Sequence, residues 1–285
     1  MASGTLVLCE NDWTVELDPA FGGQIVRADW RGRSVLAPGE AGRAAAEQHA
    51  GCFPLVPFSN RIREARFHFR DRDVILLSPE YAAPHALHGL GWRAAWSAER
   101  AGPAEARMQF EHERGAWPWR YRAVQTVQVE ADGLHVTLSI TNLDAGPMPS
   151  GIGLHPYFVR PEGLWVTART AGHWATAPGE TGLPLRREPA PADLGAPGLD
   201  HCFHGWDGYA AFGGTNAALI TLTASPSLGN IVIYTPPGKP YFCAEPVSHV
   251  TDAINMDGLP EPEQMAVLLP GETLSGTMTL SVTPG

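Results

Sequence analysis

The chain has 285 residues and a formal net charge of −10 at pH 7. This acidic balance argues against a nucleic-acid partner, because phosphate binding needs clustered positive charge. Lys239 is the only lysine, which disfavours Schiff-base enzymes and Walker-type phosphate loops. The first residues show no signal-peptide pattern and no apolar run is long enough to span a bilayer, so we expect a cytoplasmic protein without a membrane partner.

The size and the cysteines favour a fold that needs no covalent or metal support. We expect a single domain over residues 1–285, since a chain of this length buries enough surface to form its own core. The four cysteines form no Cys-x-x-Cys pair and fit buried or incidental thiols, namely Cys9, Cys52, Cys202 and Cys243.

Short runs of β-branched and aromatic residues follow one another through the N-terminal half. Residues 5–8 and 13–17 flank a polar turn, which predicts a hairpin, and residues 25–30 and 34–36 predict a second one. Further predicted strands in this half are residues 67–69, 74–77, 108–111 and 121–130.

The clearest strand is predicted over residues 134–141, where apolar and polar side chains alternate strictly after the hairpin turn Asp132-Gly133. The C-terminal half continues with predicted strands at residues 219–223, 231–234, 241–244 and 273–282. Helical periodicity is confined to short stretches at residues 42–48 and 261–268. Many short strands joined by Gly/Pro turns predict an all-β antiparallel sandwich or barrel.

Residues 175–199 differ from the rest because they are rich in Pro, Ala and Gly and show little alternation. A loop of this length in a compact domain is usually functional or disordered. It leads directly to Asp200, so it either borders a site or is a simple excursion between strands.

Two titratable residues end apolar runs and are each followed by proline. His155 precedes Pro156, and Glu245 precedes Pro246. We expect each proline to end a strand and hold the preceding backbone extended, which would present a general acid and a general base at two strand ends. A satisfied core histidine is the alternative interpretation of His155.

Three more residues are candidates for binding hydroxyl groups. Arg61 carries a rigid fork of donors suited to paired oxygens, although a surface ion pair is its alternative fate. His88 lies beside flexible glycine and Trp92, and Asp200 lies among aromatics. The pairs His85/His88 and His201/His204 have metal-like spacing but lack the partners of a zinc site, so no metal is expected.

These segments, in this order, resemble the aldose 1-epimerase (galactose mutarotase) family. The resemblance extends from about residues 21–23 to the final strand. The segments that carry it are Asn60-Arg61-Ile62, His88-Gly89 with Trp96, residues 153–158 around His155, residues 199–203 around Asp200, residues 242–246 around Glu245, and residues 251–255.

The resemblance implies a large antiparallel β-sandwich, a galactose mutarotase-like supersandwich, with a sugar as its small-molecule partner and no metal or other cofactor. By the same resemblance, Glu245 is the general base that deprotonates the anomeric hydroxyl and His155 the acid that protonates the ring oxygen. Arg61, His88 and Asp200 would bind the sugar hydroxyls. We expect a monomer or a homodimer.

The sequence departs from the galactose-specific pattern beside both catalytic candidates, where Pro156-Tyr157 and Pro246-Val247 follow. This leaves the identity of the sugar open. A hexose-6-phosphate mutarotase would add Arg63 or Arg66 around a phosphate. A glycosidase would use Asp200 and Glu245 as paired carboxylates, and a non-catalytic sugar-binding or regulatory protein could keep the same fold.

Overall fold

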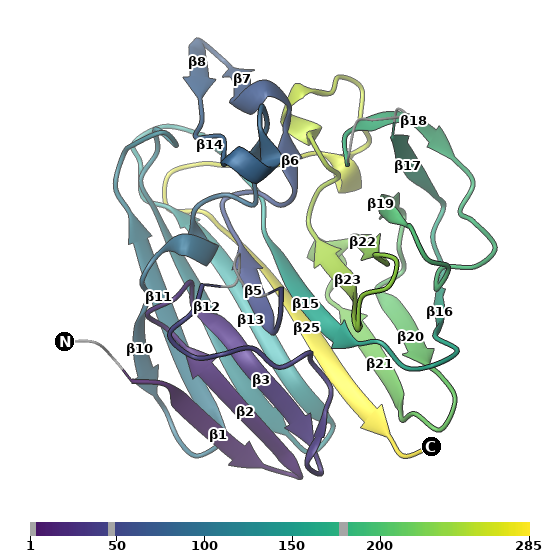
Figure 1. The fold of residues 1–285 in the computed structure, drawn as a ribbon. Coiled ribbons are helices and arrows are strands. Elements are labelled where there is room, and N and C mark those ends of the chain that lie inside the picture. The colour runs from purple at the N-terminus through teal and green to yellow at the C-terminus, as the bar shows by residue number, and fades with distance from the viewer. Residues whose placement is uncertain (1–3, 45–48, 177–181) are drawn as a thin grey trace.

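The computed structural model describes residues 4–44, 49–176 and 182–285. Within them, strands dominate and form two large antiparallel sheets, which confirms the predicted all-β sandwich (Figure 1). Helical structure in the described part is limited to 3-10 turns of three residues, which are η1 (Arg63–Ala65), η2 (Glu80–Ala82), η3 (Gly91–Arg93), η4 (Pro226–Leu228), η5 (Ala253–Asn255) and η6 (Glu261–Glu263). No helix among the described residues has the length and apolarity that a bilayer crossing requires.

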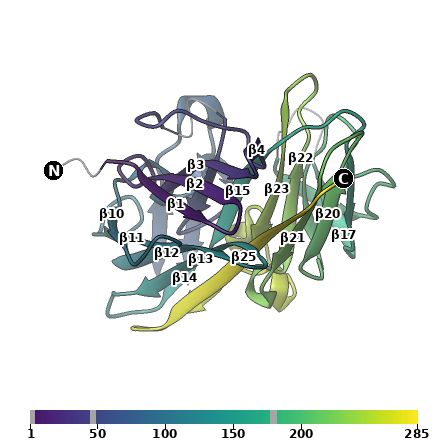
Figure 2. The ribbon, with the colours of Figure 1, turned by 90° about the horizontal axis from the view of Figure 1, so that it is seen from below.

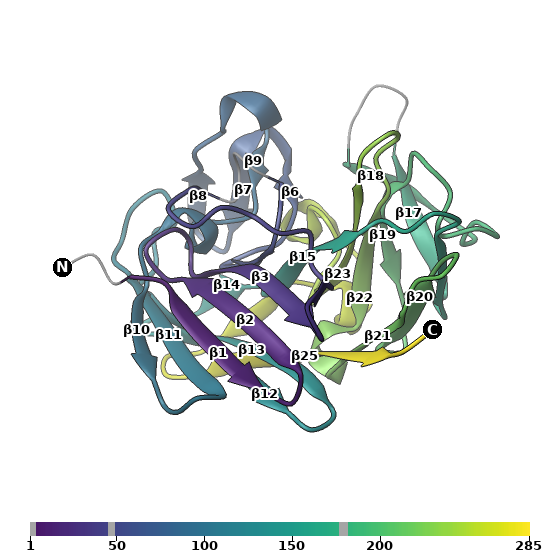
Figure 3. The same ribbon diagram turned by 60° about the horizontal axis from the view of Figure 1, so that its bottom comes forward.

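The larger sheet runs across the molecule in Figure 3, from the N-terminal strands to β17. In spatial order its strands are β1 (Leu6–Glu10), β2 (Trp13–Asp18), β3 (Gln24–Trp30), β5 (Cys52–Leu55), β15 (Gly153–Val159), β23 (Tyr241–Val247), β22 (Asn230–Tyr234), β19 (Asp200–His204), β17 (Gly172–Thr176) and β18 (Pro184–Glu188), with β4 (Arg33–Ser34) beside β3.

The second sheet lies behind the first, and Figure 2 shows the two layers from below. In spatial order its strands are β10 (Ser97–Arg100), β11 (Glu105–His112), β12 (Tyr121–Glu130), β13 (Gly133–Asn142), β25 (Thr273–Thr283), β21 (Leu219–Ala224), β20 (Tyr209–Gly213) and β16 (Trp165–Ala168). Three small pairs complete the described strands, β6 (Arg61–Ile62) with β9 (Ala86–Leu87), β7 (Arg66–Phe69) with β8 (Arg72–Ile75), and β14 (Met148–Ser150) with β24 (Ala266–Leu268).

Alternation along the strands decides which side chains enter the core between the sheets. On β13 the apolar set of Leu134, Val136, Leu138 and Ile140 is fully buried, as predicted, and pairs with the matching face of β25. The polar set on the other face forms cross-strand hydrogen bonds, such as that between the hydroxyls of Thr137 and Thr277 at 2.8 Å. Period-two alternation therefore fixed the register of this pair, because a slip by one residue would expose the apolar set.

Phenylalanines from both sheets join the two layers. The ring of Phe212 on β20 lies 4.5 Å from that of Phe158 on β15 and 5.0 Å from that of Phe242 on β23. Because successive side chains on a strand point to opposite faces, the neighbours of Phe158 and Phe242 point away from this core. That outer face of β15 and β23 is where His155 and Glu245 lie.

Three of the expected elements are wrong or incomplete. The helix predicted over residues 261–268 is a 3-10 turn followed by strand β24, since Pro262 occupies its first turn and residues 266–268 pair with β14. In the stretch 42–48, residues 42–44 are turn and irregular backbone, and residues 45–48 lie outside the described residues. Residues 175–199 are not all loop, because they contain the end of β17 and the whole of β18, while residues 177–181 lie outside the described part.

Candidate active site

The centre of the larger sheet brings the two catalytic candidates together. Strand β15 pairs with β23, and the register on either side, Gly153 with Val247 and Tyr157 with Cys243, places His155 opposite Glu245. Their side chains meet, with Nε2 of His155 3.3 Å from Oε1 of Glu245. Both side chains are buried.

The prediction that each residue ends a strand is wrong. Both β15 and β23 continue through the proline, to Val159 and Val247 respectively. The ladder between the two strands has no regular pairs from 154 to 156, where Pro156 and Pro246 lie, and it resumes at Tyr157. Proline cannot donate a ladder hydrogen bond, and the strands tolerate both prolines because they fall in the same gap.

Aromatic rings hold the imidazole of His155 in place. The ring is stacked between Phe53, at 4.6 Å, and Tyr157, at 4.7 Å, and the ring of His88 meets it edge-on at 5.1 Å. Phe53 lies directly opposite His155 on β5, and Tyr157 follows it on the same face of β15. The sequence interpretation missed Phe53 and Tyr157, although alternation along residues 153–159 could have placed Tyr157 beside His155.

Burial shifts both members of the pair toward their neutral forms. It lowers the pKa of His155 to about 3. It also raises the pKa of Glu245 well above its usual value, to which the negative charge of Asp200 adds. Both shifts favour the state with a neutral imidazole and a protonated carboxyl group. The state with ionised Glu245 and protonated His155 contains the same number of protons, so one transfer across the 3.3 Å contact interconverts them.

His88 is a neutral hydrogen-bond donor whose orientation is fixed by its backbone neighbours. The backbone N–H of Asn60 donates to Nδ1 of His88 at 3.1 Å, which leaves the proton of the neutral ring on Nε2. The backbone N–H of His88 in turn donates to the carbonyl of Asn60 at 2.9 Å. Both residues have a positive φ, 59° and 55°, a backbone strain that is common at functional sites. Burial lowers the pKa of His88 well below its usual value.

Arg61 lies at the start of β6, beside the same site. Its Nη1 donates to Oδ1 of Asn60 at 3.2 Å. The segment 175–199, for which a site border and a simple excursion were both open, reaches this guanidinium. A Cβ on Gly182, which has a φ of +72°, would lie 2.3 Å from Nη1 of Arg61. Residue 182 therefore needs to be glycine for the arginine to keep its place.

Asp200 begins β19 and faces Tyr234 of β22. Burial raises the pKa of Asp200, while the charge of Arg61 acts in the opposite direction. A cavity of about 10 Å³, room for about one water, lies here; its lining residues are Asn60, Trp174, Thr176, Gly182, Pro184, Asp200, Cys202 and Thr251. Residues 182 and 184 thus border the site, whereas residues 190–192 and 194 line a different cavity, together with residues 166–169.

Glu263 is a buried carboxylate that sequence reasoning missed. Its Oε2 accepts from the indole N–H of Trp174 and its Oε1 from Arg187, both at 2.9 Å, while Nδ1 of His204 lies 3.5 Å from Oε1. The carboxylate therefore holds one wall of the site, Trp174, from behind. No local sequence pattern predicted that Glu263 would bind Trp174 and Arg187, because residue 263 was assigned to a helix.

His249 supports the floor of the site without facing it. The backbone N–H of Ser59 donates to Nε2 of His249 at 3.2 Å, and Nδ1 donates to the carbonyl of Val250 at 2.8 Å. Burial lowers the pKa of this ring to about 4.

The cations proposed for a phosphate group are already engaged. Nε of Arg63 lies 3.4 Å from Oδ2 of Asp252, and Nε of Arg66 lies 3.5 Å from Oε2 of Glu64. The two histidine pairs with metal-like spacing also do not form donor clusters in the described residues. One ring nitrogen of His85 accepts the backbone N–H of Glu64, as His88 does from Asn60.

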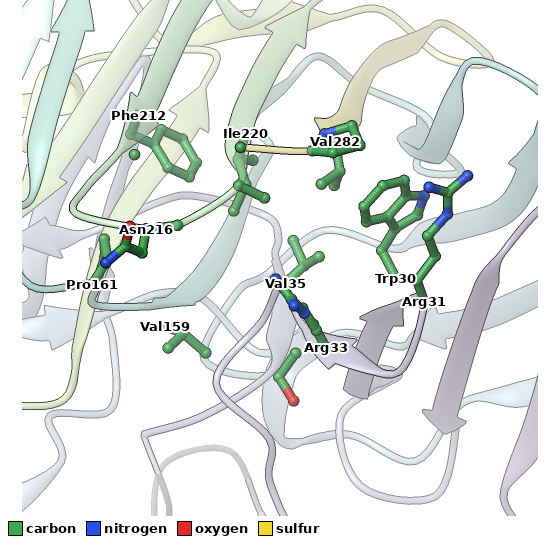
Figure 4. Close-up of a pocket in the computed structure, with 16 residues that line it drawn as sticks. Trp30, Arg31, Arg33, Val35, Val159, Pro161, Phe212, Asn216, Ile220 and Val282 are labelled. Carbon is green, nitrogen blue, oxygen red and sulfur yellow. The ribbon is translucent and has the colours of Figure 1, made fainter.

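A larger cavity, of about 520 Å³, is lined by residues from both large sheets (Figure 4). Trp30, Val35 and Val159 line it from the larger sheet, and Phe212, Ile220 and Val282 from the smaller one. None of the five candidate site residues lines it. Of the five, Asp200 lines the smaller cavity instead.

These features define a class of protein. An antiparallel sandwich of this topology, with a buried histidine and glutamate in mid-sheet, has the galactose mutarotase-like fold. A galactose mutarotase-like protein from Clostridium acetobutylicum has a similar structure, with a TM-score of 0.86 at 18% identity over 99% of this chain and 95% of that one.

Sequence relatives and the family pattern agree with the fold. The aldose 1-epimerase family matches residues 13–281. The chain is 32% identical to the uncharacterized protein YphB of Escherichia coli K12, with 94% of this chain and 96% of YphB aligned. A crystal structure from Escherichia coli K12 superposes with a TM-score of 0.82 at 28% identity, covering 99% of both chains. The chain belongs to the aldose 1-epimerase family.

Proposed function

We propose that this protein is an aldose 1-epimerase that interconverts the α and β anomers of a hexose or related sugar. The observation that supports this most directly is the contact between His155 and Glu245, two proton carriers 3.3 Å apart on adjacent strands. Stacking fixes one of them and the sheet backbone fixes the other, so both act from defined positions.

In the proposed reaction, Glu245 removes the proton from the anomeric hydroxyl while His155 protonates the ring oxygen. The C1–O5 bond breaks and a free aldehyde forms. Rotation about the C1–C2 bond then presents the other face of the carbonyl, and ring closure returns both protons. In this proposal the pair shares one proton, which lets it enter the cycle without exchanging protons with solvent.

The other candidates bind the sugar in this proposal. The Nε2–H of His88 donates near the ring oxygen, because Nδ1 is already occupied by the backbone of Asn60. Arg61 and Asp200 supply a donor fork and an acceptor for hydroxyl groups.

The energetic demand is modest. A positioned acid or base contributes about 10²–10⁴-fold each, so the pair removes roughly 5–11 kcal/mol from the barrier at about 1.36 kcal/mol per decade. Ring opening proceeds slowly in water by itself, and no further chemical group is required.

Polarimetry on freshly dissolved α-glucose, α-galactose and a hexose 6-phosphate tests the proposal. We expect faster mutarotation of at least one free sugar, and a fall of about 10²–10⁴-fold in kcat for Glu245→Gln and for His155→Asn. His135→Asn is the matched control, because His135 also contacts a carboxylate, Asp132, at 2.9 Å but lies on the second sheet. Unchanged rates in both site variants would refute the mechanism.

The phosphate arm of the same experiment separates the nearest alternative. Arg63 and Arg66 are paired with carboxylates, so we expect no preference for the hexose 6-phosphate. Release of sugar from an aryl glycoside would instead indicate a glycosidase that uses Asp200 and Glu245.

A further inference from the structure

A third side chain joins the catalytic pair in the same layer of the sheet. Cys243 lies two residues before Glu245 on β23 and therefore points to the same face. One ligand atom each from His155, Cys243 and Glu245, a ring nitrogen, a thiol sulfur and a carboxylate oxygen, lie within 4.8 Å of one another. All three side chains are buried.

Two of these three side chains have a polar atom without a hydrogen-bond partner. Nδ1 of His155 and Oε2 of Glu245 are buried without a partner. Buried polar atoms without partners are uncommon and need a physical explanation. Because Oε2 of Glu245 has no partner, this carboxyl group can accept a further ligand such as a bound cation.

The set matches the preferences of a borderline-soft divalent cation. Thiolate, imidazole and carboxylate are the ligands of Zn²⁺, at about 2.3 Å for sulfur and about 2.0–2.1 Å for nitrogen and oxygen. Those bond lengths place tetrahedral ligand atoms roughly 3.3–3.5 Å apart. The contact of 3.3 Å between Nε2 of His155 and Oε1 of Glu245 already meets this spacing. The sulfur of Cys243 lies within 4.8 Å of both ligand atoms and must move closer to complete the site.

We propose that His155, Cys243 and Glu245 form an inhibitory site for a thiophilic divalent cation such as Zn²⁺. Three protein ligands leave the fourth tetrahedral position to water. Formation of the metal–sulfur bond releases the thiol proton to solvent, and binding of the carboxylate releases the proton of Glu245. The occupied site can neither accept the anomeric proton nor protonate the ring oxygen, so sugar and metal exclude each other.

The proposal depends on the proposed function for the meaning of inhibition, but not for binding. Binding is measured on the full chain without sugar, using Co²⁺ as the spectroscopic probe. We expect a saturable thiolate-to-cobalt absorption in the near ultraviolet with one equivalent bound, and its displacement by Zn²⁺. A chain that binds Co²⁺ in this way yet never accelerates mutarotation would refute the proposed function and leave the metal site standing.

Variants test the ligands. The thiolate absorption should disappear in Cys243→Ser and persist in Cys202→Ser, whose thiol is also buried but lies on β19, which β22 separates from β23. Cys9→Ser controls for binding to the exposed thiol. Circular dichroism and thermal unfolding check that each variant folds, and Cys243→Ala replaces Cys243→Ser if the buried hydroxyl prevents folding.

Inhibition supplies the second readout. For each variant, the mutarotation rate with Zn²⁺ is divided by its own rate with a chelator, so that differences in basal activity cancel. We expect Cys243→Ser to need roughly tenfold or more Zn²⁺ than the wild type for half-inhibition. Absence of the absorption in the wild type, its persistence in Cys243→Ser, or an undiminished rate in the zinc-loaded protein would overturn the proposal.

Discussion

The buried pair of His155 and Glu245 is expected to lower the stability of the fold that carries it. The double substitution His155→Phe with Glu245→Leu tests this. A phenylalanine keeps a ring between Phe53 and Tyr157, and a leucine keeps an apolar side chain of similar volume on β23. Both orphaned polar atoms, Nδ1 and Oε2, are removed together with the contact between the two side chains.

The expected gain follows from these atoms. Each buried polar atom without a partner costs about 2 kcal/mol, and the lost contact is worth about 1 kcal/mol. The larger ring at position 155 costs roughly 1 kcal/mol in packing. The free energy of unfolding should therefore rise by about 2 kcal/mol, or by about 4–8 °C in Tm for a chain of this size, while mutarotation is lost. Removal of a carboxyl group whose pKa burial has raised acts in the same direction.

Urea unfolding at neutral pH and calorimetry measure the change. The pair His135 and Asp132 provides the contrast, because both ring nitrogens of His135 are hydrogen-bonded, one to Asp132 and the other to the hydroxyl of Thr279 at 2.9 Å. The corresponding double variant, His135→Phe with Asp132→Leu, should gain no stability. A loss of stability in the His155 and Glu245 double variant would refute this reasoning. It would show that burying Nδ1 and Oε2 without partners does not destabilise the fold.

Three more predictions concern the surroundings of the site. His249 has a folded pKa of about 4 against 6.5 for the free side chain, so its contribution to stability is intact above about pH 6.5 and falls by roughly 3 kcal/mol down to about pH 4. Urea unfolding across this range should show a smaller decrease in His249→Gln than in the wild type; equal slopes would contradict the assignment. Gly182→Ala should displace Arg61 and raise KM by about 10–100-fold, the worth of a hydrogen bond to a charged group. Gly238→Ala shares the positive φ but has no atom within 4 Å of the added Cβ, so initial-rate kinetics should show an unchanged KM; equal effects would mean that the backbone, not Arg61, is responsible. Glu263→Gln should lower the free energy of unfolding by about 2 kcal/mol through its weakened charge-assisted hydrogen bonds, and an unchanged denaturation midpoint would contradict that.

Local patterns were sufficient wherever one face of a strand is apolar and the next turn is marked by glycine or proline. Residues 121–130 and 134–141 were placed as β12 and β13 because their alternation and the Asp132-Gly133 turn agree with each other. The same logic gave the all-β class. The single domain, the monomer or homodimer and the cytoplasmic location remain predictions.

The proline rule misled the interpretation at the most important positions. Pro156 and Pro246 predicted strand ends, since a proline normally interrupts a ladder. The tertiary structure places both prolines in the one part of the β15–β23 ladder that has no regular pairs. Neither strand therefore needs a backbone N–H from the proline of the other. Only the pairing of two strands about 90 residues apart in sequence decides this, and no local pattern records it.

The amino-acid sequence by itself determined the strand-rich architecture, because period-two alternation is a local property. The five candidate residues came from their side-chain chemistry together with the resemblance to the family, and they remain predictions. The tertiary structure alone decided that His155 and Glu245 touch, that Phe53 and Tyr157 clamp the imidazole, and that Cys243 joins them. The physical reason is that these contacts depend on the order and register of strands β5, β15 and β23. That order is set by the packing of the whole sheet against its partner rather than by any one segment.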